Sequence, residues 1–152
     1  MEMTISKEFR FEASHILPKH PGKCSRLHGH SWRLEVTVQG SVHHDSGFVM
    51  DYGQLSAKVN PLIEELDHRH LGSWDIPLQM LDLSTDWLLE HNENWAAPGL
   101  SKNFYPSSEN LIVWIGERLL ERGLDWHQLR LNETCTSSCV LNRADFDRGV
   151  HE

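Results

Sequence analysis

The chain has 152 residues, of which 39% are hydrophobic and 24% are charged, as is typical of one globular domain. Its formal net charge of −8 argues against broad binding of nucleic acid or a membrane surface, because both need a basic face. No apolar run reaches the roughly 18 residues of a membrane span, and the N-terminus lacks the features of a signal peptide. Three cysteines are too few for a disulfide framework, so we expect a reducing, cytoplasmic setting.

Two segments near the N-terminus alternate between apolar and polar residues. From residue 3 to 15 the odd positions are mostly apolar and the even positions are polar. Residues 30–40 repeat the pattern, with Trp32, Leu34, Val36 and Val38 on one face. This period of two predicts two half-buried strands.

Helical spacing follows in the middle of the chain. Asp51 is a candidate N-cap, and after it come Leu55, Val59, Leu62 and Leu66. Pro61 lies inside this pattern and should bend or split the helix. A short helix is also expected near residues 81–91.

The second half of the chain predicts one more helix and two more strands. Residues 106–109 (Pro-Ser-Ser-Glu) are typical of a capped helix start, and Gly123 should end that helix. Strands are expected at residues 127–133 and at about 138–146. The order of these strands and helices along the chain favours an α+β domain with an antiparallel sheet and the helices on one face.

Three of the eleven histidines are predicted to meet at one end of this sheet. His15 ends the apolar face of the first strand, while His28 and His30 lie on the matching face of the second. If the two strands pair antiparallel, the three imidazoles point to the same side. Three neutral imidazoles with an open fourth position are typical of catalytic zinc. The alternative is a set of surface histidines at strand ends.

Cys24 and the Asp67-His68 pair are candidate proton-transfer groups. Cys24 lies in the loop between the histidine strands, where Lys23 and Arg26 would lower its pKa. It is a candidate base, a candidate fourth metal ligand, or an inert loop cysteine. A carboxylate beside an imidazole can orient it for proton transfer, although adjacent residues can also point apart.

A carboxylate and a basic loop complete the candidate residues. Glu133 falls on the apolar side of its strand, so it needs a partner, either an N–H or cationic edge of a ligand or a neighbouring arginine. Lys19, Lys23 and Arg26 form a local basic patch that fits a small anion or is simply a solvated loop. Cys135 and Cys139 are interpreted as structural.

Six short motifs, in this order, resemble the 6-pyruvoyltetrahydropterin synthase / 6-carboxytetrahydropterin synthase family. They span nearly the whole chain. The motifs are Phe11-Glu12-Ala13-Ser14-His15, Cys24-x3-His28-Gly29-His30, Met50-Asp51-Tyr52, Leu66-Asp67-His68, Pro106-Ser107-Ser108-Glu109-Asn110 and Asn132-Glu133-Thr134.

The resemblance implies a tunnelling fold, in which each subunit has a four-stranded antiparallel sheet with two helices on one face. Three subunits close a barrel, and two trimers form a hexamer with active sites between subunits. The resemblance also implies Zn²⁺ on His15, His28 and His30, with Cys24 as the base. Asp67 and His68 would relay protons, and Glu133 would anchor a pterin ring.

The spacing of three residues between Cys24 and His28 resembles the bacterial 6-carboxytetrahydropterin synthases of queuosine biosynthesis. The implied reaction is a lyase reaction on 7,8-dihydroneopterin triphosphate, which releases triphosphate and acetaldehyde. Lys19, Lys23 and Arg26 would contact the triphosphate. The alternatives are a 6-pyruvoyltetrahydropterin synthase and a non-catalytic zinc- or pterin-binding paralogue.

The chain departs from the family pattern between His68 and Pro106. This connection is longer than usual, and Gly72 stands where the family usually has asparagine. We therefore expect a single domain over residues 1–152 with an insertion at about 72–105. Such an insertion could cover the site, add an oligomer contact or alter substrate choice.

Overall fold

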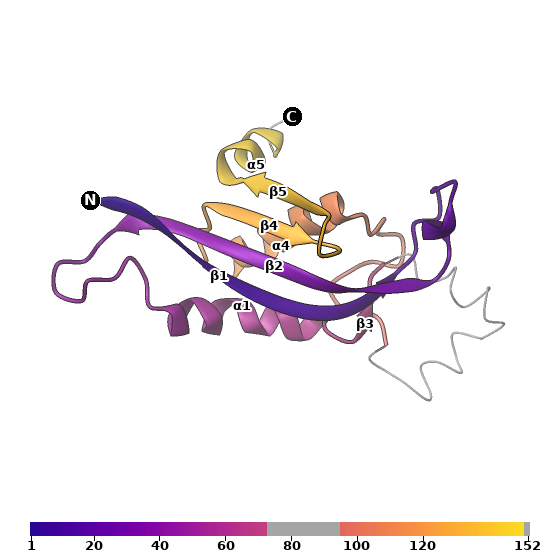
Figure 1. Cartoon of the computed structure of the whole chain (residues 1–152), viewed down its shortest axis with the longest axis horizontal. Helices are drawn as coiled ribbons and strands as arrows, with labels where there is room; N and C mark the ends of the chain where they lie inside the picture. The colour runs from indigo at the N-terminus through magenta and orange to yellow at the C-terminus, as the bar shows by residue number, and fades with distance from the viewer. Residues whose placement is uncertain (73–94, 151–152) are drawn as a thin grey trace.

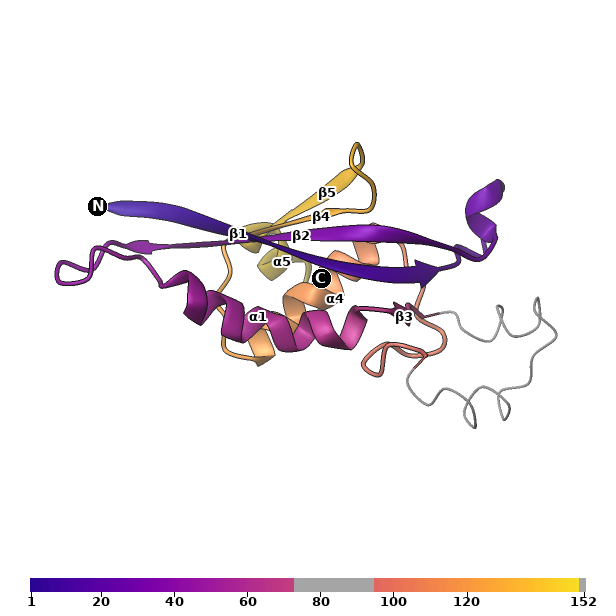
Figure 2. The same cartoon turned by 60° about the horizontal axis from the view of Figure 1, so that its bottom comes forward.

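The computed structural model describes residues 1–72 and 95–150. A five-stranded sheet in the order β3-β1-β2-β4-β5 lies against helices α1 and α4, which share one face of it (Figures 1 and 2). The strands are β1 (Glu2–His15), β2 (His28–Ser41), β3 (Arg69–His70), β4 (Gln128–Asn132) and β5 (Ser138–Asn142). No described helix is long and apolar enough to cross a membrane.

Strands β1 and β2 form a long antiparallel hairpin whose register runs from Glu2↔Ser41 to His15↔His28. Alternation places the apolar side chains of both strands on the helix-covered face, where Phe11, Trp32 and Leu34 are almost fully buried. The predicted strands are therefore confirmed, and so is the α+β class. The loop between them contains the short 3-10 helix η1 (Lys23–Ser25).

Helix α1 (Tyr52–Leu66) begins as predicted, with Asp51 as its N-cap accepting from two backbone amides. Pro61 lies inside the helix but does not split it. Leu62 and Leu66, which follow the proline, are fully buried. Burial of each of these leucines stabilises the fold by about 1.5–3 kcal/mol. Together the two leucines offset the roughly 3 kcal/mol cost of a proline inside a helix.

Helix α4 (Ser108–Glu121) also follows its prediction. The Ser107 side chain caps it by accepting from the Asn110 amide. Gly123 follows the helix end with a φ of 78°, a left-handed conformation that glycine adopts without steric cost.

Two features of the described fold differ from the expected four antiparallel strands and two helices. Strand β3 adds a fifth strand, parallel to β1, so the sheet is mixed. The expected last strand ends at Asn142, and residues Arg143–Gly149 form helix α5. Alternation stops at this point, and Arg143 instead pairs with Asp147 one helical turn later. The short helix expected near 81–91 lies outside the described residues.

The chain leaves β3 through a tight left-handed turn at Gly72. Its φ is 56°, and a Cβ at this position would stand 2.4 Å from the Phe104 carbonyl oxygen. A residue with a Cβ therefore does not fit at position 72 beside Phe104. This close packing gives a physical reason for the glycine at this turn.

Candidate metal site

The register of β1 and β2 brings His15, His28 and His30 together. His15 stands directly across from His28, and His30 pairs with Ala13 two residues away. The three ring centroids lie 4.5, 5.0 and 5.1 Å apart. One ligand atom from each ring lies within 4.8 Å of the others, so the three histidines can hold a metal ion.

Two of these histidines are fixed in the tautomer that metal binding needs. The His15 Nδ1 bonds the Pro106 carbonyl oxygen at 2.8 Å, and the His28 Nδ1 bonds the Arg26 carbonyl oxygen at 2.7 Å. A carbonyl can only accept, so each Nδ1 carries the proton and each Nε2 keeps its lone pair. Both Nε2 atoms are buried without a hydrogen-bond partner, and this arrangement fits two metal ligands.

Burial also favours the neutral form of His15 and His30. Burial, with a smaller effect of the neighbouring histidines, lowers the pKa of the fully buried His15 to about 4, although the bond to the Pro106 carbonyl acts in the opposite direction. Burial likewise lowers the pKa of His30, although the Glu133 carboxylate acts in the opposite direction. Neutral imidazole is the form that binds a metal, so the site is ready to bind one at neutral pH.

Glu133 lies against these histidines rather than against an arginine. It follows β4 directly, and its side chain is 27% exposed. Its Oε1 lies 3.2 Å from the His15 Nε2 and 3.3 Å from the His30 Nε2. No arginine among the described residues pairs with it, so the expected ligand partner of this carboxylate stays a prediction.

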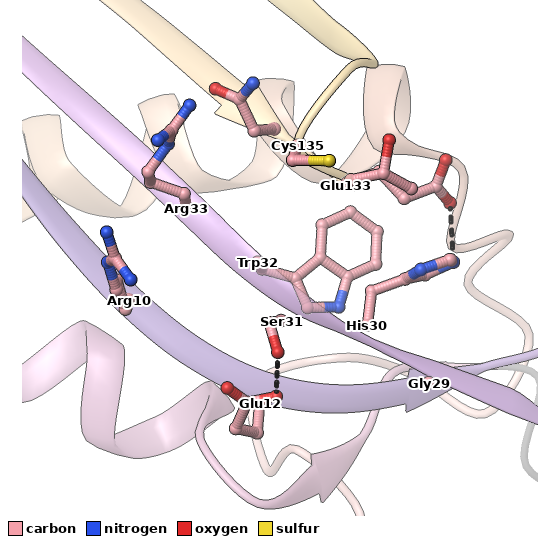
Figure 3. Close-up of a pocket in the computed structure, with 11 residues that line it drawn as sticks. Arg10, Glu12, Gly29, His30, Ser31, Trp32, Arg33, Glu133 and Cys135 are labelled. Atoms are coloured by element: carbon pink, nitrogen blue, oxygen red, sulfur yellow. Dashed lines mark hydrogen bonds and ion pairs between the residues drawn. The ribbon is translucent and has the colours of Figure 1, made fainter.

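A pocket of about 470 Å³ opens beside His30 and Glu133 (Figure 3). Sequence reasoning missed its other walls, which come from β1, from β2, from the end of β4 and from the turn after it. The remaining lining residues are Arg10, Glu12, Gly29, Ser31, Trp32, Arg33, Asn132, Thr134 and Cys135. Arg10 and Arg33 stand at one side of this pocket, and His30 and Glu133 stand at the other.

Cys24 and the basic residues lie in the β1–β2 loop, next to the histidines in sequence but not in the wall of this pocket. Cys24 is part of η1 and half-buried, and it does not join the three histidines as a fourth ligand. The Lys19 ammonium lies 5.9 Å from the centre of the Tyr105 ring. Lys23 and Arg26 begin and follow η1.

Asp67 and His68 form an oriented pair at the end of α1. The Asp67 Oδ2 lies 2.8 Å from the His68 Nδ1, and its Oδ1 accepts from the Glu12 amide at 2.7 Å. Desolvation raises the pKa of Asp67, but these hydrogen bonds outweigh it, so the pKa lies below its usual value. His68 has a φ of 59°, and its side chain is 79% exposed. The pair is thus oriented by hydrogen bonds but is not part of the pocket wall.

Residues 4–144 match the model of the 6-pyruvoyl tetrahydropterin synthase family. The chain belongs to this family. It is 36% identical over 140 residues to a 6-carboxy-5,6,7,8-tetrahydropterin synthase from Synechocystis, covering 88% of each protein. It is also 29% identical to the Haemophilus influenzae enzyme of the same name, covering 89% of this chain and 95% of that protein.

The fold of the family is seen in the structure of Caenorhabditis elegans 6-pyruvoyl tetrahydropterin synthase. The TM-score is 0.68 at 20% identity, covering 93% of this chain and 96% of that one. This likeness establishes the tunnelling fold of the subunit. With the relatives above, it makes the chain an enzyme of the pterin synthase family.

Proposed function

We propose that this chain is a zinc-dependent 6-carboxy-5,6,7,8-tetrahydropterin synthase. It would convert 7,8-dihydroneopterin triphosphate to the 6-carboxy product with release of acetaldehyde and triphosphate. The observation that carries the proposal is the set of three histidine nitrogens facing one another, two of them locked with Nε2 free. The names of the Synechocystis and Haemophilus relatives support this choice of reaction.

His15, His28 and His30 would hold the zinc through Nε2. Zinc at this site would act as a Lewis acid on the side-chain hydroxyls of the substrate and so acidify the neighbouring C–H bond. The donor set fits zinc because it has three neutral imidazoles and no fourth protein ligand within 4.8 Å of all three among the described residues. Such a site keeps one position open for substrate.

Cys24 takes the carbon-bound proton in this proposal, and the Asp67-His68 pair serves as the partner acid and base. Asp67 fixes His68 through Nδ1, which leaves Nε2 for proton transfer. Neither Cys24 nor His68 lines the pocket beside His30. We therefore propose that the site is completed between subunits, within a homohexamer made of two barrel-shaped trimers.

Glu133 would bind the N–H edge of the pterin ring, since its carboxylate is a half-buried acceptor in the pocket wall. Lys19, Lys23 and Arg26 would contact the triphosphate from the β1–β2 loop. The cytoplasmic location and the place in queuosine biosynthesis remain predictions.

The test is to incubate zinc-loaded protein with dihydroneopterin triphosphate and to assay acetaldehyde and triphosphate. Release of both supports the proposal. Triphosphate without acetaldehyde points instead to a 6-pyruvoyltetrahydropterin synthase. No turnover points to a binding protein that kept the site. Full activity in a Cys24→Ala variant would contradict the role of the cysteine.

A further inference from the structure

A row of hydrogen-bond donors crosses three strands of the sheet at the pocket. Arg10 on β1 stands directly across from Arg33 on β2, and Arg33 stands directly across from Asn132 on β4. Residues paired in this way point to the same face of a sheet. Their neighbours Phe11 and Leu34 are buried on the helix-covered face, so this donor row lies on the opposite face. All three members of the row line the pocket of about 470 Å³.

The two arginines of the donor row share one carboxylate. Like charges directly across from each other destabilise a sheet, and Glu8 offsets them here. One Glu8 oxygen accepts from Arg10 at 3.2 and 3.3 Å, and the other lies 3.4 Å from the Arg33 Nε. Glu12, also in the pocket wall, is engaged with the Ser31 hydroxyl at 2.7 Å. The Arg33 side chain makes no hydrogen bond within the described part of the chain, so its terminal N–H groups are left for a ligand.

Asn132 adds an amide without a partner to the same row. The residue is only 8% exposed, yet its side chain makes no hydrogen bond to any residue that the structure describes. A buried polar group without a partner is costly, and the amide has two N–H donors to satisfy. Because Asn132 lines the pocket, a ligand there can supply the missing acceptor. This observation points to a ligand independently of the two charges.

We propose that Arg10, Arg33 and Asn132 bind the triphosphate of the substrate. The inference rests on the proposed function and adds a subsite on the sheet face to the loop cations named there. Guanidinium groups bind phosphate oxygens through pairs of N–H donors. Neighbouring strands are about 4.7–4.9 Å apart, so the row extends about 10 Å and suits a linear polyphosphate. The charged tail would thus lie across the pocket from His30 and Glu133 (Figure 3).

The experiment measures dissociation constants for two probes by titration calorimetry. Inorganic triphosphate is titrated into zinc-free protein, because triphosphate chelates zinc, and neopterin, which carries no phosphate, into zinc-loaded protein. Arg33→Gln should weaken triphosphate roughly tenfold to a hundredfold through the loss of a charged hydrogen bond. Asn132→Leu loses a neutral hydrogen bond and should weaken triphosphate about twofold to tenfold. Affinity for neopterin should stay at the wild-type value in both variants.

The matched control is Arg130→Gln. Arg130 lies on the same face of β4, directly across from Glu35 and outside the pocket wall. This variant removes the same charge as Arg33→Gln, so its affinity for triphosphate should stay near that of wild type. Equal weakening in both variants would reveal a general effect of net charge and contradict the proposal.

The remaining outcomes separate the subsite from the proposed function. Wild-type affinity for triphosphate in Arg33→Gln, or an equal loss of neopterin, overturns the inference. A wild-type protein that binds no triphosphate overturns it as well. If wild type binds triphosphate at the donor row but does not bind neopterin, the proposed function fails while the subsite stands. Circular dichroism melts check that each variant folds.

Discussion

Replacement of the buried His70 by leucine should make the zinc-free protein less sensitive to acid. His70 lies in β3 with 4% exposure, its Nδ1 bonds the Ser14 hydroxyl at 2.9 Å, and its ring stacks on Trp95. Burial lowers its pKa from 6.5 to about 4. Between these two pH values the unfolded chain binds a proton that the folded chain does not. The free energy of unfolding therefore falls as the pH falls.

The size of the effect follows from the two pKa values. Above pH 6.5 neither state is protonated, and His70 has no effect on the pH dependence. The proton on the unfolded state costs the fold about 2 kcal/mol at pH 5 and about 3 kcal/mol at pH 4. The leucine variant loses the hydrogen bond to Ser14, which contributes about 1 kcal/mol to stability. Its unfolded state, however, has no imidazole at position 70 to bind a proton, so it avoids the acid-dependent loss of stability.

The assay is urea unfolding from pH 7 to pH 4 in the presence of a chelator, at one protein concentration. Wild type should be more stable by about 1 kcal/mol at pH 7, and the variant should be more stable by about 1 kcal/mol at pH 5. Groups that do not interact with His70 titrate alike in both proteins, so their contributions to the pH dependence cancel. The effect of His70 on the pKa of His15 is the smallest of the causes of that shift. A stability difference that stays the same at pH 7 and pH 5 would refute the reasoning.

Three other predictions concern the Asp67-His68 pair, the turn at Gly72 and zinc binding. Asp67→Asn should lower kcat about 100-fold or more with little change in KM, because His68 loses its orienting carboxylate; wild-type acetaldehyde release would contradict this. Gly72→Ala should lower the free energy of unfolding, measured in urea, by about 2–4 kcal/mol, since the new Cβ meets the Phe104 carbonyl. The matched control is Gly47→Ala, which has a similar φ of 73° but open space around it. This control should lower the free energy of unfolding by only about 1–2 kcal/mol. Equal losses at both glycines would remove the clash as the cause. Zinc at a thousandfold excess over its dissociation constant should stabilise the fold by about 4 kcal/mol, reversed by a chelator, and an unchanged melting midpoint would rule out tight binding.

Local sequence patterns were sufficient to predict most of the described secondary structure. The alternation along β1 and β2 and the caps at Asp51 and Ser107 are set by residues close in sequence, so they can be read without the fold. Local patterns failed to predict the elements whose formation depends on contacts between residues distant in the sequence. β3 has only two residues and exists because it pairs with Ala13 and Ser14. α1 continues through Pro61 because the core covers its far half.

The sequence by itself determined that His15, His28 and His30 share one face and one end of a hairpin, because strand periodicity fixes side-chain direction. Only the tertiary structure decided which atoms surround them. The carbonyl that orients His15 belongs to Pro106, 91 positions away, and every residue carries the same carbonyl, so no side-chain pattern marks it. The placement of Glu133 against two imidazoles likewise depends on how β4 pairs with β2, a long-range contact that no local pattern encodes.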